Sequence, residues 1–271
     1  MSETIYENQV LLGTFTGATT TSNVQVFTTP GTWIRPSNFT VVRFEAWGGG
    51  GAGGSGGAPG ATFAAGAGGG AYVEYWWDPI TSPTKFPITG PLPVTVGLGG
   101  VASTDLQPVA VYGGDGGNSI ISFGPTNIIA YGGTGSGGPS SPFGACGAGA
   151  GVLSAGVRNV GGNGGGGTGA GPPAPNQSGT IFGGGGGVVN ATQAGGSIYG
   201  GGGGFGSFPT TQTSGSLSVF GGPGGAGASP TVAAQPGKIP GGGGGGGNAG
   251  SSNPFRIGGN GGAGLVRITT Y

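Results

Sequence analysis

Histidine is absent from this 271-residue chain, and cysteine occurs once, at Cys146. These absences exclude Ser-His-Asp and Cys-His nucleophile systems, zinc sites with imidazole ligands, and any disulfide within the chain. Charge is also scarce, since seven Lys and Arg residues balance seven Asp and Glu residues. Because no basic cluster is present to displace counterions from phosphates, we expect no nucleic-acid binding. Chains without net charge tend to associate, so we expect a permanent assembly.

Long apolar runs are missing as well. No stretch reaches the roughly 18 apolar residues of a membrane span, and Met1–Gln9 has neither the basic nor the apolar region of a signal peptide. We therefore expect no membrane insertion. Residues 1–23 form a polar, Thr-rich opening with one apolar patch, which predicts an N-terminal attachment arm. The candidate anchor residues of this arm are Ile5, Tyr6, Val10, Leu11 and Leu12.

Glycine is the residue in excess, with 77 copies, many of them in runs such as Gly183–Gly187 and Gly241–Gly247. Glycine loses more conformational freedom on folding than any other residue, so flexible linkers are the simplest interpretation of such runs. Two observations favour order. The chain holds 13 Phe, 7 Tyr and 4 Trp and few charges, whereas disordered chains are charged and poor in aromatics. We therefore expect the runs to pack side by side as polyproline-II-type helices, which have three residues per turn.

Segments in which apolar and polar residues alternate predict β-strands, and no segment has a helical apolar period. The predicted strands are Phe39–Trp47, Ala71–Trp77, Leu265–Tyr271, Val24–Phe27 and Val94–Leu98, with a hairpin over residues 118–131 and short candidates at 180–182, 197–199 and 217–220. Strands thus occupy both ends of 24–271, and glycine dominates the middle. This order predicts an all-β sandwich with essentially no α-helix and a glycine-rich insertion at about 132–264.

The alternation also assigns residues to faces of the predicted strands. Tyr72 and Trp76 fall on the face opposite the presumed core, and we interpret them as candidates for contacts between subunits. Glu45 falls on an outward face too, where we expect a solvated side chain or an ion pair with Arg43 or Arg35. The Ser-, Thr- and Pro-rich segments 139–143 and 208–218 are candidate loops for recognition of a carbohydrate or protein surface.

A family resemblance runs through the strand segments. The stretch VFTTPGTWIRPSNFTVVRFEAWGGGGAGG at 26–54, followed by GGGAYVEYWWDP, PVTVGLGG and GGNSIISFG, resembles the glycine-rich domain of bacteriophage tail fibres and related virion proteins. The chain is also similar to the glycine-rich extracellular region of certain receptor tyrosine kinases. These resemblances imply a jelly-roll sandwich of the TNF type that bears polyglycine II helices. TNF-like sandwiches usually form trimers, so the resemblance implies a homotrimer.

On this resemblance we expect a virion structural protein, a tail-fibre or tail-tip component that adheres to the host. Its expected partners are other virion proteins, further copies of itself and a host cell-surface receptor. A capsid decoration or head-fibre protein stays open as an alternative. A polysaccharide depolymerase would need two working carboxylates. The carboxylates considered are Glu45, Glu74, Asp78, Asp105 and Asp115. Because their settings favour ion pairs or turns, we expect no enzymatic activity, no cofactor and no metal.

Overall fold

The structure is a computed structural model of the chain. It describes residues 2–7, 10–16, 22–36, 39–55, 64–78, 90–104, 111–137, 146–156, 180–188, 194–206, 214–229, 231–247 and 257–271, with the backbone alone for residues up to 16. Within these ranges the chain forms ten strands and no helix. The prediction of an all-β fold without α-helix is confirmed for this part of the chain.

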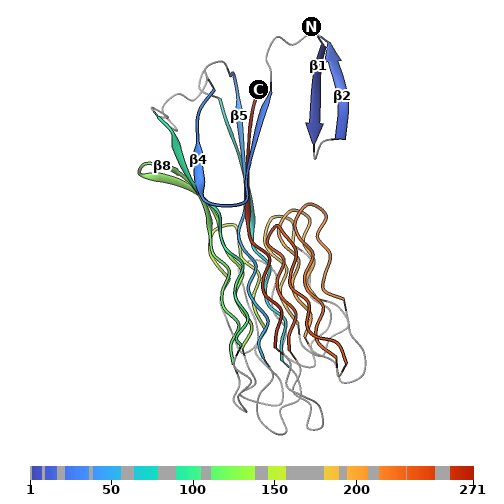
Figure 1. The fold of residues 1–271 in the computed structure, drawn as a ribbon. Coiled ribbons are helices and arrows are strands. Elements are labelled where there is room, and N and C mark those ends of the chain that lie inside the picture. The colour runs from blue at the N-terminus through green and yellow to red at the C-terminus, as the bar shows by residue number, and fades with distance from the viewer. Residues whose placement is uncertain are drawn as a thin grey trace.

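Two four-stranded antiparallel sheets pack against each other as a β-sandwich (Figure 1). The first sheet has the order β3 (Asn23–Phe27), β10 (Leu265–Thr270), β5 (Val42–Trp47) and β6 (Tyr72–Trp77). The second has the order β4 (Gly31–Trp33), β7 (Leu92–Thr95), β8 (Ser119–Phe123) and β9 (Thr126–Ala130). The C-terminal strand β10 pairs with β3 and β5, so its predicted partners from the first half of the chain are confirmed.

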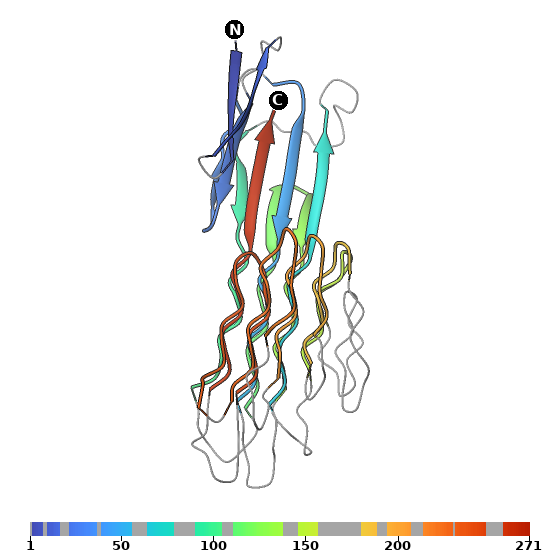
Figure 2. The same cartoon turned by 90° about the vertical axis from the view of Figure 1, so that its right-hand side faces the viewer.

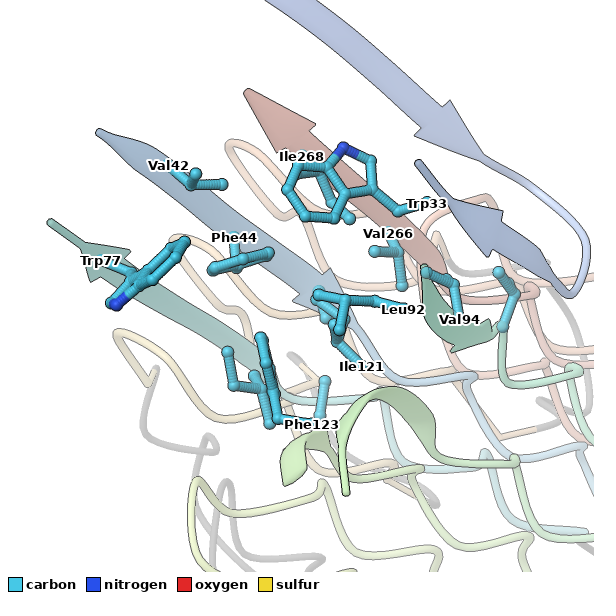
Figure 3. Packing of buried hydrophobic residues seen from close by; sticks show 14 residues of the cluster. Trp33, Val42, Phe44, Trp77, Leu92, Val94, Ile121, Phe123, Val266 and Ile268 are labelled. Carbon is cyan, nitrogen blue, oxygen red and sulfur yellow. The ribbon is translucent and has the colours of Figure 1, made fainter. Parts of the chain in front are cut away.

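The core lies between the two sheets, where alternate residues of each strand meet (Figure 3). Val42 and Phe44 of β5 are fully buried there, as their alternation with charged residues predicts. Phe44 meets Trp33 of the second sheet edge to face, with ring centroids 5.9 Å apart, and meets Phe123 at 5.2 Å. Such edge contacts are the geometry that aromatic quadrupoles favour. The aromatic residues therefore join the two sheets into one core.

The N-terminal arm is a hairpin of β1 (Ser2–Glu7) and β2 (Val10–Thr16). It forms a two-stranded sheet of its own and, among the described strands, pairs with neither sheet of the sandwich. Its register shifts between Ile5 and Tyr6, and Tyr6 lies opposite Leu11. All five candidate anchor residues lie on these two strands, and their role stays a prediction.

A layer of extended glycine-rich segments continues from one end of the sandwich (Figures 1 and 2). Segment 48–55 follows β5 and shows how the layer is bonded. The amide of Gly48 donates to residue 71, that of Gly49 to residue 117, and that of Gly50 to residue 262. The next three amides repeat this order of neighbours, at residues 68, 114 and 259. Each neighbouring segment is therefore bonded at every third residue.

This packing leaves no room for a side chain at most glycine positions inside the layer. A Cβ atom at Gly53 would lie 1.9 Å from the carbonyl oxygen of Gly245, and one at Gly149 would lie 1.9 Å from that of Gly184. Real Cβ atoms do not approach backbone oxygen so closely. Alanine occurs in the layer at selected buried positions such as Ala52 and Ala148. The glycine content of these segments thus follows from the close approach of neighbouring backbones.

The predicted boundaries, about 132–264, describe one glycine-rich insertion. The layer is not made from that insertion alone. It also contains segments 48–55, 64–71, 97–104 and 111–118, each of which directly continues a strand of the first half of the chain. The hydrogen bonds of the sheet are followed directly by those of the glycine layer. Gly48 is the first residue after β5, and its amide donates to the carbonyl of Ala71 at 2.9 Å. The sandwich and the layer therefore share their chain segments and form one continuous body.

Candidate interaction surface

The first sheet turns its second face away from the core, and this face carries the charged residues of β5, β6 and β10. The strand register aligns Arg267, Glu45 and Glu74 in one row across the sheet. Arg43 and Trp76 lie opposite each other in the next row. Two cations and two carboxylates thus occupy adjacent positions on one surface.

Glu45 is the centre of this group and is only 1% exposed. Arg267 binds its carboxylate with two nitrogen atoms, at 2.6 and 2.7 Å. Arg43 approaches the same carboxylate at 3.0 Å, as the ion-pair prediction allowed. A buried carboxylate is tolerated only where it is paired and hydrogen-bonded, and these two guanidinium groups meet that condition. The solvated alternative for Glu45 is wrong, because the side chain is enclosed by its partners.

The register places Glu45 directly opposite Glu74, an arrangement that is unfavourable for like charges. The hydroxyl of Tyr72 lies between them, 3.0 Å from Glu45 Oε1 and 2.9 Å from Glu74 Oε2, and Arg43 Nε donates to Glu74 at 3.2 Å. Burial raises the pKa of Tyr72, and the neighbouring carboxylates raise it further. Burial alone would raise the pKa of Glu74, but hydrogen bonds from Tyr72, Arg43 and Trp76 outweigh it and lower that pKa. The network keeps Tyr72 protonated and Glu74 ionised at neutral pH.

Tyr72 and Trp76 have different surroundings although both lie on the predicted outer face. Tyr72 is 1% exposed because Tyr199 and Phe182 of the same chain stack on it, with ring centroids 5.2 and 6.3 Å away. The prediction that Tyr72 contacts another subunit is therefore wrong. Trp76 is 51% exposed and stacks on Tyr271 at 5.8 Å. Its role as a subunit contact stays a prediction.

The residues that cover Tyr72 belong to a repeated turn. The tetrads Thr180–Gly183 (TIFG), Ser197–Gly200 (SIYG) and Ser218–Gly221 (SVFG) lie side by side, linked by single parallel bridges at their first residues. Lys238–Gly241 (KIPG) aligns with them in sequence. The three strand candidates in this part of the chain are thus stacked turns that touch through isolated bridges. The turns lie at the sandwich end of the glycine layer (Figure 2).

Hydroxyl groups hold successive turns together. Ser197 Oγ accepts the amide of Gly200 at 2.9 Å and donates to the carbonyl of Gly183, in the preceding turn, at 2.7 Å. Ser218 repeats both bonds with Gly221 at 2.8 Å and Gly200 at 2.6 Å. Each serine therefore closes its own turn and fixes that turn to the one before it. This explains the serine at the first position of the second and third tetrads.

The third position of each tetrad builds an aromatic column. Phe182 and Tyr199 stack with centroids 5.3 Å apart and planes 13° apart, and Tyr199 and Phe220 do so at 5.0 Å and 12°. Trp47 Nε1 donates to the backbone carbonyl of Tyr199 at 2.7 Å, which joins the column to the first sheet. Sequence reasoning treated these stretches as short strand candidates and missed the repeat. Its signal was the recurring Ser/Thr-aliphatic-aromatic-Gly pattern between glycine runs.

Apolar side chains of the turns are left on the surface. We call the following set the apolar ridge, whose members are 40% to 79% exposed: Ile181, Phe182, Ile198, Leu217, Val219, Phe220 and Ile239. The second position of each tetrad contributes one aliphatic residue, so the ridge follows the stacking of the turns. No formal charge occurs among these residues. The ridge is therefore suited to contact with an uncharged surface.

Among the carboxylates considered for catalysis, Glu45 and Glu74 form ion pairs with arginines of the same chain. Asp115 Oδ1 accepts the amide of Gly135 at 2.8 Å, and Asp105 lies outside the described residues. No group of three or more His, Cys, Asp or Glu in the described part of the chain is placed to hold a metal ion. Nor is any described helix long and apolar enough to cross a membrane. Residues 139–143 and 208–213 of the predicted recognition segments lie outside the described ranges.

A sandwich continued by a glycine layer defines the described part of the molecule as an all-β fold with a glycine-rich domain. The family model described as a glycine-rich domain matches residues 21–271, so the chain belongs to that family. A search of curated proteins found no match.

Proposed function

We propose that the chain is a structural protein of a bacteriophage virion, a tail-fibre or tail-tip component that adheres to the host cell. In this proposal the sandwich is a jelly roll of the TNF type and the protein works as a homotrimer. The observation that carries the proposal is the glycine layer, whose segments are bonded through backbone groups at every third residue. The strand segments that resemble phage glycine-rich domains flank the same layer.

We propose further that these segments are polyglycine II helices. A helix with three residues per turn directs successive amides toward three different neighbours and then returns to the first. The bonding of residues 48–55 has this period, and segment 64–71 repeats it. Gly66 and Gly69 of that segment donate to residues 188 and 185, while Ala67 and Gly70 donate to residues 244 and 241. Both series support a lattice of such helices.

A lattice of this kind suits a virion appendage. Its described segments are held together by backbone hydrogen bonds, and in this proposal the layer serves as a stiff spacer. Ser55 and Val111 form a bridge at its far end, and Gly247 donates to Gly54 there at 2.8 Å. Described segments that lead into residues 56–63 and 248–256 thus end together, remote from the sandwich. This arrangement supports a rod with the sandwich at one end and chain connections at the other.

Immunogold electron microscopy of purified particles tests the proposal, together with saturable binding of the purified protein to host cells. Label at the tail end and competition with infection would support a tail adhesin. Label on the capsid would support the alternative of a decoration or head-fibre protein. Release of sugar from host polysaccharide would favour a depolymerase. Absence of the protein from purified particles would overturn the virion assignment.

A further inference from the structure

The apolar ridge is large for an exposed surface. Leu217 and Val219 are 79% and 70% exposed, and the five other members are between 40% and 58% exposed. These fractions correspond to an area on the order of 800 Å², whereas the largest apolar patch of a typical monomer is about 300–600 Å². Leaving this area in water is unfavourable. A partner that covers the ridge would remove this cost.

The charges around the ridge do not direct it toward a charged partner. On the adjacent sheet face, Arg43 and Arg267 are satisfied by Glu45 and Glu74 of the same chain. Most of the ridge lies on the three stacked turns that share the Ser/Thr-aliphatic-aromatic-Gly sequence. An uncharged and repetitive surface is complementary to the same surface on another copy, which is the condition for a self-complementary interface.

We propose that the apolar ridge is a contact between copies of this chain, in which the ridge of one copy packs against the ridge of another. Its area of roughly 800 Å² is about one partner's share of a standard specific interface. Phe220 lies at one end of the aromatic column and is 58% exposed, so a large aromatic group is available in the contact. This inference rests on the proposed self-association; a ridge-to-ridge contact relates two copies by two-fold symmetry, so it is separate from the three-fold contacts of the proposed homotrimer.

The test uses the 271-residue chain and compares substitutions at two valines that are equally exposed. Val219 lies in the ridge, and Val101 lies in segment 97–104, which continues β7 of the second sheet; each is 70% exposed. The variants are Val219→Lys, Val101→Lys and the double variant Val219→Lys with Ile181→Lys. Molar mass is measured by light scattering and sedimentation velocity over a range of concentrations. Thermal melting verifies that each variant keeps the fold.

We expect an oligomer for the unchanged chain and for Val101→Lys. Val219→Lys should raise the dissociation constant at least about tenfold, because a buried valine contributes about 1.5–3 kcal/mol and a lysine introduces a charge. The double variant should keep the fold and lose the pairing through the ridge, so its molar mass should be at most half that of the unchanged chain. A monomeric unchanged chain at about 100 μM, or equal masses for Val219→Lys and Val101→Lys, would overturn the inference. Neither result bears on particle localisation, so the virion proposal is tested separately.

Discussion

Replacement of Gly245 by alanine would place a methyl group inside the glycine layer, between backbone segments that are in contact. Its Cβ would lie 1.9 Å from the carbonyl oxygen of Ala226 and 2.5 Å from the carbonyl carbon. That oxygen accepts the amide of Gln235 at 2.8 Å, and the amide of Gly245 donates to Gln235 at 3.0 Å. The obstructing atoms are backbone atoms held by their own hydrogen bonds. No side-chain rotation can therefore relieve the overlap.

The magnitude follows from the displacement that the methyl group requires. One segment must move by more than about 1 Å to restore an ordinary contact, and overpacking of this kind costs about 1–3 kcal/mol. The movement also breaks or lengthens at least two hydrogen bonds, each contributing about 0.5–1.5 kcal/mol. We expect Gly245→Ala to lower the free energy of unfolding by about 2–6 kcal/mol, a large part of the 5–15 kcal/mol typical of a domain.

Gly90 is the matched control, because a Cβ there would meet nothing within 4 Å. Gly90→Ala should leave stability unchanged or raise it by about 0.4–1 kcal/mol, since it restricts the unfolded chain. Gly114→Ala should lie between the two, as its nearest obstructing atom is 3.1 Å away. Urea unfolding followed by tryptophan fluorescence measures all three. Equal midpoints for Gly245→Ala and Gly90→Ala would refute the packed-lattice reasoning.

Three further substitutions test the network and the stacked turns. Tyr72→Phe removes the hydroxyl between Glu45 and Glu74 and should lower stability by about 1–3 kcal/mol at pH 7. Because the folded pKa of Tyr72 is raised, its contribution to stability is full below its unfolded value of about 10 and falls at higher pH. The unfolding midpoints of the two proteins should therefore approach each other as the pH rises above about 10. The folded pKa of Glu74 is lowered, so its contribution to stability is full above about pH 4.3 and is lost as the pH falls through the folded pKa. Glu74→Gln should therefore reduce the loss of stability at acid pH, measured as the free energy of unfolding against pH. An unchanged loss of stability at acid pH would contradict this. Ser197→Ala removes two bonds of one turn, and hydrogen exchange at the Gly200 amide should accelerate at least about tenfold; unchanged exchange would show that the hydroxyl does not hold the turn.

Much of the sandwich could be predicted from alternation in the sequence. The pattern of Val42, Phe44 and Ala46 against Arg43 and Glu45 identified both the strand and its core face, because successive side chains of a strand point to opposite faces. The C-terminal strand was equally clear and was expected to pair with early strands. These patterns are local, so they predict strands without knowledge of the tertiary structure.

The candidate interaction surface could be predicted only in part from the sequence. Placing Tyr72 on the outer face was correct, but its covering by Phe182 and Tyr199 depends on turns that are far away in the sequence. Arg267 could not be assigned to Glu45 from a local pattern for the same reason, since the two are 222 residues apart. The repeat that builds the apolar ridge was present in the sequence, yet glycine runs of varied length separate its copies.

Composition and alternation by themselves determined that this chain is all-β, nearly uncharged and built around close-packed glycine. Those properties depend on residue type and on neighbours within a few positions. Only the tertiary structure decided which glycine segments lie together, that Glu45 is buried between Arg43 and Arg267, and that the turn residues form one ridge. The physical reason is that glycine has no side chain to encode a partner. Its neighbours in the lattice are selected by the strands and turns that position the backbone.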